Sequence, residues 1–107
     1  SIDLDAFARA VDDPSIVVID GQGPGGYEEH HVPGSLDFEL EDVLGQATAA
    51  GLTPDTPIVV YCSDDDCLGS EFVGTQLVHG GYTDVRRFPG GIAEWERAGR
   101  AVGSLER

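Results

Sequence analysis

The chain has 107 residues and a formal net charge of −14 at pH 7, with 20 acidic residues, six arginines and no lysine. This length predicts one domain over residues 1–107. The negative field repels nucleic acid and anionic lipid, so we expect neither as a partner. No apolar run approaches the ~20 residues of a membrane span, which excludes a membrane segment within this chain.

The acidic composition has two possible explanations. The charges form an ordinary solvated surface, or the protein is adapted to high salt, since molar salt shortens the Debye length to about 3 Å and removes most of the repulsion between the carboxylates. Methionine is absent even at position 1, which suggests a trimmed chain or a domain excised from a longer protein. The two cysteines are too few for a disulfide scaffold or an all-cysteine zinc site. They fit a reactive pair or a local disulfide in a reducing, cytoplasmic compartment.

Strands and helices are expected to alternate along the chain. Asp3 is a suitable N-cap for a helix that ends near residues 12–14. The glycine-rich stretch 21–26 predicts a flexible loop. The expected strands are residues 16–20, 35–38, 58–61 and 85–88, with Ile2 as the tail of an edge strand, and the later helices are residues 39–50, 71–79 and 92–98.

This alternation with short connections predicts an α/β fold, a parallel sheet covered by helices on both faces. Function in such sheets lies at the carboxyl ends of the strands. Asp20 and Cys62 both end predicted strands, so we expect them at one edge. Cys62 precedes a short loop and a helix, a setting in which amide groups and the helix dipole stabilise a thiolate. The alternative is a buried cysteine that only ends a core strand.

Four segments together resemble the rhodanese-like domain: VVID (17–20), YEEHHVPGS (27–35), PIVVYC (57–62) and GYTDVRRFPGGIAEWERAG (81–99). The resemblance covers nearly the whole chain. It implies a three-layer α/β/α fold with a five-stranded parallel sheet, and sulfur transfer through a cysteine persulfide. Cys62 matches the catalytic cysteine, residues 31–34 match a structural turn, and Trp95 matches a core aromatic.

The resemblance also implies an active-site loop whose amides hold the substrate, formed by Ser63, Asp64, Asp65, Asp66, Cys67 and Leu68. The family commonly has a basic residue in this loop and an arginine soon after the position of Asp20. Here the loop is acidic, and Gln22 stands where that arginine is expected. A second loop cysteine occurs in a subset of the family, so we interpret this chain as a variant.

The acidic loop predicts weak use of thiosulfate, a dianion. One carboxylate about 7 Å from the sulfur, at an effective dielectric of ~40–80, disfavours the thiolate by roughly 0.6–1.2 kcal/mol. High salt should reduce this effect. A neutral or protein-borne sulfur donor, and a small or protein-borne thiol acceptor, therefore fit better. The same carboxylates are equally consistent with plain solvated charges.

Cys67 is a candidate resolving thiol, able to attack a persulfide or sulfenic acid on Cys62. The alternative is that it turns inward as a small apolar side chain. We expect no cofactor and no metal, because three adjacent carboxylates lack the spacing of a Ca²⁺ loop. His30 and His31 are expected on the surface.

These observations favour a sulfurtransferase or sulfur carrier with Cys62 as nucleophile. A non-catalytic interaction module of the same family, and a thiol redox sensor built on Cys62 and Cys67, remain as alternatives. A cysteine phosphatase is disfavoured because the loop offers no cation to the phosphoryl oxygens.

Overall fold

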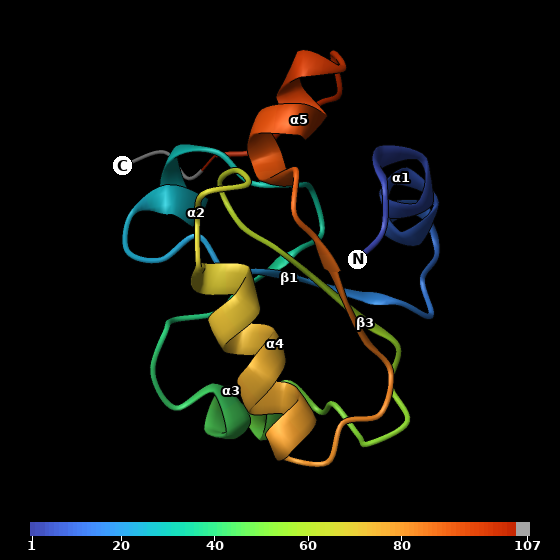
Figure 1. Ribbon diagram of the computed structural model, residues 1–107, viewed down its shortest axis with the longest axis vertical. Coiled ribbons are helices and arrows are strands. Elements are labelled where there is room, and N and C mark those ends of the chain that lie inside the picture. The colour runs from blue at the N-terminus through green and yellow to red at the C-terminus, as the bar shows by residue number, and fades with distance from the viewer. Residues whose placement is uncertain (105–107) are drawn as a thin grey trace.

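A computed structural model describes residues 1–104. Four parallel strands form one sheet in the order β2-β1-β3-β4 (Figure 1). The strands are β1 (Val17–Asp20), β2 (Leu36–Asp37), β3 (Ile58–Tyr61) and β4 (Val85–Phe88). The helices are α1 (Leu4–Asp12), α2 (Gly26–Glu29), α3 (Val43–Ala49), α4 (Gly69–His79) and α5 (Gly91–Arg97).

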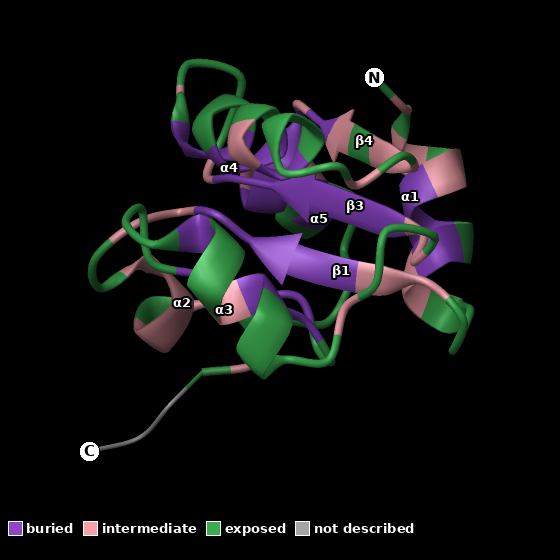
Figure 2. Cartoon of the chain, turned by 90° about the horizontal axis from the view of Figure 1, so that it is seen from below, coloured by how far each residue is buried: buried purple, intermediate pink, exposed green. Residues whose placement is uncertain are grey.

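Side chains alternate between the two faces of the sheet and build two separate cores. On one face Val59, Tyr61 and Phe88 pack with Phe7 of α1 and Trp95 of α5. The other face packs against α3 and α4, with a core made of Ile19, Phe38, Val43, Ala47, Ile58, Val60, Val73 and Leu77. Figure 2 shows the central strands buried between these layers. The predicted α/β/α architecture and the core position of Trp95 are confirmed.

The central strand β3 is a run of apolar, mostly β-branched residues, and all four of its residues are buried. Such a run suits a strand with helices on both faces. It pairs in register with β1 on one side and β4 on the other, so Asp20, Tyr61 and Phe88 end their strands side by side. The carboxyl edge of the sheet therefore begins at these three residues.

The expectation of five strands is wrong for residues 1–104, where the sheet has four. Ile2 donates one backbone hydrogen bond to the carbonyl oxygen of Arg87, at 2.8 Å. Asp3 then caps α1, with its carboxylate accepting from the Ala6 amide at 2.9 Å. Because α1 begins two residues after this contact, there is no room for a ladder of hydrogen bonds. Ile2 therefore lies beside β4 at the edge of the sheet without forming a fifth strand.

The helix predicted over residues 39–50 is shorter, because its first turn is replaced by a side-chain clamp. The Gln46 amide accepts from the Glu39 N–H and donates to the carbonyls of Glu39 and Glu41, each at 2.9 Å. Asp42 then caps α3 in a left-handed conformation, with φ of 48°. Residues 39–41 consequently form a loop beside the carboxyl edge of the sheet. In the described part of the chain, no helix is long and apolar enough to cross a membrane.

Candidate active site

Cys62 follows the last residue of β3 and lies at the carboxyl edge of the sheet. Cys62 is almost fully buried, with 1% of its surface exposed. The Sγ atom lies 3.3 Å from the carbonyl oxygen of Gly21. A Cβ added to Gly69, the first residue of α4, would collide with that same oxygen and lie 3.1 Å from Sγ. Gly21 and Gly69 thus let two backbone segments close against the sulfur.

The backbone of Cys62 is fixed by the start of α5. The amides of Ile92 and Ala93 donate to the carbonyls of Cys62 and Ser63, each at 2.9 Å. Gly91 has a left-handed φ of 64°, and a Cβ there would lie 2.5 Å from the Cys62 oxygen. Gly91 therefore lets the start of α5 pack against the base of the loop.

The loop after Cys62 returns on itself and brings the two cysteines together. The Cys67 amide donates to the Asp64 carbonyl at 3.2 Å, and the Asp66 amide donates to Asp64 Oδ1 at 3.0 Å. Cys62 and Cys67 form a disulfide, with their Cα atoms 6.0 Å apart. The structure thus brings Cys67 to Cys62, and the chemical role of Cys67 stays a prediction.

The remaining predicted loop residues are mostly solvated. Asp64, Asp65 and Asp66 are exposed, Leu68 is 72% exposed, and Ser63 is half-buried. Exposed carboxylates act on the sulfur through a partly aqueous path, which weakens their influence. Since the amides of Asp66 and Cys67 donate within the loop when the cysteines are bridged, the expectation that amides of residues 63–68 hold an anion stays a prediction.

A buried carboxylate at the end of β1 organises the edge next to Cys62. Asp20 is fully buried and accepts hydrogen bonds from the Gln22 amide at 2.8 Å, the Gln22 side chain at 2.7 Å and the Tyr61 hydroxyl at 2.6 Å. The Tyr61 hydroxyl also accepts from the Val32 amide at 2.9 Å and contacts Ser35 Oγ at 2.9 Å. Burial and the neighbouring Asp20 raise the pKa of Tyr61 far above its ordinary value, so it remains a neutral donor.

Gln22 links this network to the loop. Its Nε2 also donates to the His30 carbonyl at 2.8 Å, and its Oε1 accepts from Ser63 Oγ at 3.4 Å. A neutral amide thus occupies the place where the resemblance implies an arginine, and Asp20 is satisfied without a cation. The sequence indicated Asp20 through its position at the end of a buried strand. It gave no signal for Tyr61 or Ser35 beyond the apolar run and the turn in which they lie.

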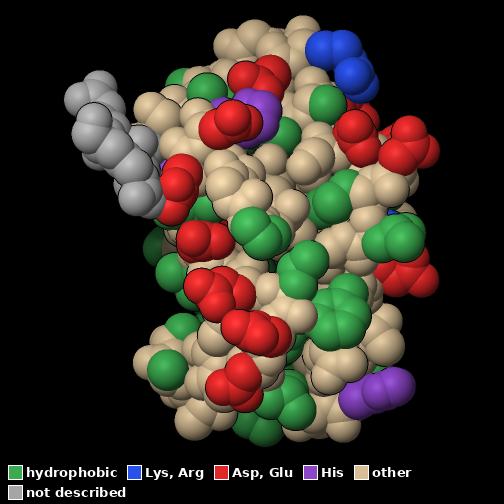
Figure 3. Space-filling model, turned by 90° about the vertical axis from the view of Figure 1, so that its left-hand side faces the viewer, with side chains coloured by type: hydrophobic (Ala, Val, Ile, Leu, Met, Phe, Trp, Pro, Cys, Tyr) green, Lys and Arg blue, Asp and Glu red, His purple; other side chains and the backbone are tan. Residues whose placement is uncertain are grey.

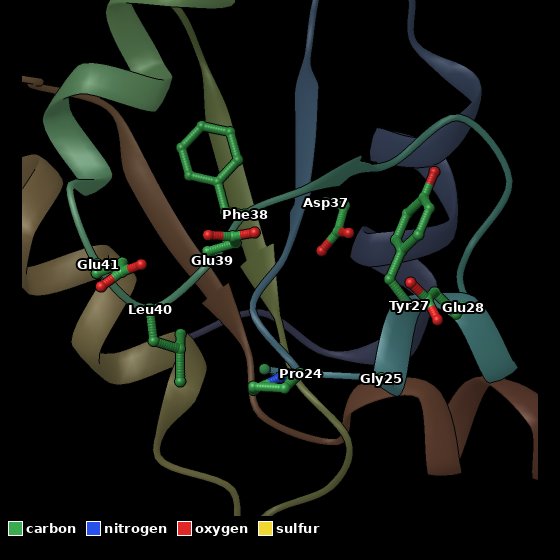
Figure 4. Close-up of a pocket in the computed structure, with 10 residues that line it drawn as sticks. Pro24, Gly25, Tyr27, Glu28, Asp37, Phe38, Glu39, Leu40 and Glu41 are labelled. Carbon is green, nitrogen blue, oxygen red and sulfur yellow. The ribbon is translucent and has the colours of Figure 1, made fainter.

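An acidic cavity of about 570 Å³ lies beside this edge, between the β1–α2 loop and the segment that follows β2. Figure 4 shows Tyr27 and Glu28 facing Asp37 across it, and Glu39 and Glu41 also line it. Partial desolvation, then the negative charge of Asp20, raises the pKa of Asp37, although the residue is exposed at the rim of the cavity. Figure 3 shows acidic side chains down this side of the molecule. The cavity does not include Cys62, so we centre the site on the cysteine and not on the cavity.

The two adjacent histidines differ in burial. His30 is partly exposed, and its Nδ1 pairs with Glu96 at 2.8 Å. His31 is buried, stacks on Tyr27 with ring centroids 3.7 Å apart, and contacts the Tyr27 carbonyl through Nδ1 at 2.7 Å. The surface expectation is wrong for His31, because its ring is covered by the aromatic face of Tyr27 and by Gly103. Within residues 1–104 no group of three His, Cys, Asp or Glu side chains is arranged to hold a metal ion.

Comparison with known proteins places this chain in a family. The family model described as "Rhodanese-like domain" matches residues 3–98. The chain is 29% identical over 92 residues to a thiosulfate sulfurtransferase GlpE of Pseudoalteromonas translucida, covering 82% of this chain and 80% of that protein. It is also 29% identical over 100 residues to a putative thiosulfate sulfurtransferase SseB of Mycobacterium tuberculosis, of which it spans 35%.

Solved structures show the same fold at lower identity. The Alr3790 protein from Anabaena aligns with a TM-score of 0.84 at 21% identity, over 97% of this chain and 80% of that chain. SseA from Escherichia coli, described with the 3-mercaptopyruvate sulfotransferases, aligns with a TM-score of 0.78 at 24% identity, over 99% of this chain and 51% of that one. Together with the family match over residues 3–98, these similarities establish that the chain belongs to the rhodanese-like domain family.

Proposed function

We propose that this protein is a sulfurtransferase or sulfur carrier in which Cys62 bears the transferred sulfur as a persulfide. The observation that carries the proposal is the position of Cys62, held by α5 at the end of the central strand with its sulfur directed to the loop and to the first turn of α4. The Cys62 thiolate attacks the sulfane sulfur of a donor, the bond from that sulfur to the rest of the donor breaks, and the rest of the donor leaves with the electron pair. An acceptor thiolate later attacks the terminal sulfur of the persulfide and releases the Cys62 thiolate.

The relatives named as thiosulfate sulfurtransferases support the reaction class, while the loop of this chain argues for a different donor. Three exposed carboxylates lie between Cys62 and Cys67. They repel a dianion during encounter and disfavour the thiolate. We propose a neutral or protein-borne sulfur donor and a small or protein-borne thiol acceptor. Because the reaction needs a free Cys62 thiolate, we place it in a reducing compartment, the cytoplasm.

The test is sulfur transfer to a thiol acceptor under reducing conditions, with thiosulfate and with inorganic polysulfide as donors. Wild-type protein should transfer sulfur and Cys62→Ser should not. The thiosulfate rate should rise about threefold to tenfold between low and molar salt, since a Debye length of ~3 Å screens the loop charges. A Cys62→Ser protein that still turns over would refute the assignment.

Substituting single carboxylates separates the effect of the loop from that of net charge. Asp65→Asn and Asp66→Asn remove loop carboxylates, whereas Asp55→Asn removes an exposed carboxylate before β3, at the opposite edge of the sheet. We expect the first two variants to raise the thiosulfate rate at low salt and to flatten its salt dependence. If Asp55→Asn has the same effect, net charge and not the loop controls the donor preference.

A further inference from the structure

We propose that Cys67 is a second catalytic residue, which attacks the persulfide of Cys62 and releases its sulfur as hydrosulfide. The inference rests on the proposed function, because it needs a persulfide on Cys62. It adds an activity that transfer to an external acceptor does not include: donor sulfur is reduced to sulfide inside one chain, and the Cys62–Cys67 disulfide of the structure is the product state.

The step balances without an external oxidant. The Cys67 thiolate attacks Sγ of Cys62, the sulfur–sulfur bond to the terminal sulfur breaks, and that sulfur leaves with the bonding electron pair as hydrosulfide, keeping its own proton. The two cysteine sulfurs lose two electrons in total, and the sulfane sulfur gains them. A dithiol reductant then reduces the disulfide and restores both thiols for the next cycle.

The geometry of the loop supports intramolecular attack. The Cα atoms of the two cysteines are 6.0 Å apart, inside the usual range for a disulfide of about 4.4–6.8 Å. Cys62 is the fixed partner, because α5 holds its carbonyl and Gly21 and Gly69 close on two sides of its sulfur. Cys67 approaches from the loop side. Holding a nucleophile in place in this way replaces a bimolecular encounter with an intramolecular reaction.

Asp64 positions the attacking cysteine. Its carbonyl accepts from the Cys67 amide and its Oδ1 accepts from the Asp66 amide, so one residue closes the turn that returns Cys67 to Cys62. Asparagine can keep the Oδ1 acceptor without the charge, whereas alanine cannot. The pair Asp64→Asn and Asp64→Ala therefore separates the turn from the electrostatics of the loop.

Burial also decides how the disulfide is reopened. Cys62 is 1% exposed, whereas Cys67 is half-buried. An external thiol therefore reaches the sulfur of Cys67, and Cys62 is the leaving thiolate. Reduction from that side returns the nucleophile directly and places any mixed disulfide on Cys67.

The experiment is a single turnover without oxygen. Fully reduced protein is loaded with inorganic polysulfide, desalted, and followed by intact mass and by sulfide assay. Wild-type protein should release one sulfide per chain and lose two hydrogen atoms relative to the reduced chain. Cys67→Ser should keep one added sulfur and release sulfide only when dithiothreitol is supplied. Cys62→Ser has no second thiol to attack a sulfur loaded on Cys67, so it too should release no sulfide without dithiothreitol.

The outcomes separate the two proposals. If wild-type protein keeps its added sulfur as long as Cys67→Ser does, the role of Cys67 is refuted and the persulfide function stands. If Cys67→Ser gains no sulfur, the proposed function itself fails. Asp64→Ala should release sulfide about fivefold more slowly, the effect of losing one hydrogen bond, and Asp64→Asn should restore the rate. Equal slowing in both variants would refute the positioning of Cys67 by Asp64.

Discussion

The Tyr61 hydroxyl is the single group whose removal should most disturb the buried network beneath the site. It donates to the buried Asp20 carboxylate and accepts from the Val32 amide, and Val32 is fully buried. Tyr61→Phe keeps the ring, which packs edge-on against Phe7. The substitution therefore removes hydrogen bonds while leaving the packing of the ring in place.

The expected cost follows from the groups left behind. Losing a hydrogen bond to a charged group costs about 1.5–3 kcal/mol, and an orphaned buried amide costs about 1–3 kcal/mol. Ser35 Oγ keeps its bond to the Val32 carbonyl and Asp20 keeps both bonds from Gln22, which limits the loss. We expect a destabilisation of about 3 kcal/mol, or roughly 12 °C in melting temperature for a domain of this size.

Urea unfolding of the reduced protein measures this cost, since reduction removes the disulfide from the comparison. Tyr82→Phe is the matched control. Its hydroxyl makes a single 3.4 Å contact with the Leu52 carbonyl and is only partly buried, so its loss should cost under about 1 kcal/mol. Equal stability of the two variants would refute the account of the Asp20 network as a buried, tightly bonded support of the site.

Two further changes test local features. Gly69→Ala should destabilise the fold by about 2 kcal/mol or more and slow alkylation of reduced Cys62, because the new Cβ collides with the Gly21 carbonyl. Gly74→Ala in the same helix, where the new Cβ meets only contacts of 3.8 Å or longer, should be neutral or stabilising. Equal losses would refute the close-approach argument. Asp37→Asn should raise the melting temperature at pH 7 and not near pH ~3. Folding raises the pKa of Asp37 through partial desolvation and the charge of Asp20, so its carboxyl costs stability only above its unfolded pKa, where it ionises. An equal gain at both pH values would exclude ionisation as the cause.

Most of the fold was predictable because apolar runs and turn residues determine it locally. The apolar, β-branched composition of β3 predicts a buried strand, and the capping side chain of Asp3 predicts the start of α1. The errors arose where a side chain overrides periodicity. The Gln46 clamp converts the predicted first turn of α3 into a loop, and no local pattern reveals that a glutamine seven residues away bonds the Glu39 backbone.

The candidate site was predictable only in part, because several of its contacts join residues that are far apart in the sequence or depend on a turn. Cys62 was found from its position after a central strand and from the family resemblance. The Asp20–Tyr61 contact spans 41 residues of sequence, and the burial of His31 depends on stacking with Tyr27, so both follow from tertiary packing. The proximity of Cys67 to Cys62 depends on the turn closed by Asp64. The three consecutive aspartates at 64–66 are equally consistent with plain solvated charges, so the sequence did not predict this turn.

The persulfide function is tested by the mass of the reduced Cys67→Ser protein after incubation with inorganic polysulfide, followed by alkylation and peptide mapping. We expect one added sulfur, located on Cys62 and removable by a thiol acceptor. A folded protein whose Cys62 is alkylated in the reduced state, yet never gains sulfur from polysulfide, would contradict the persulfide function.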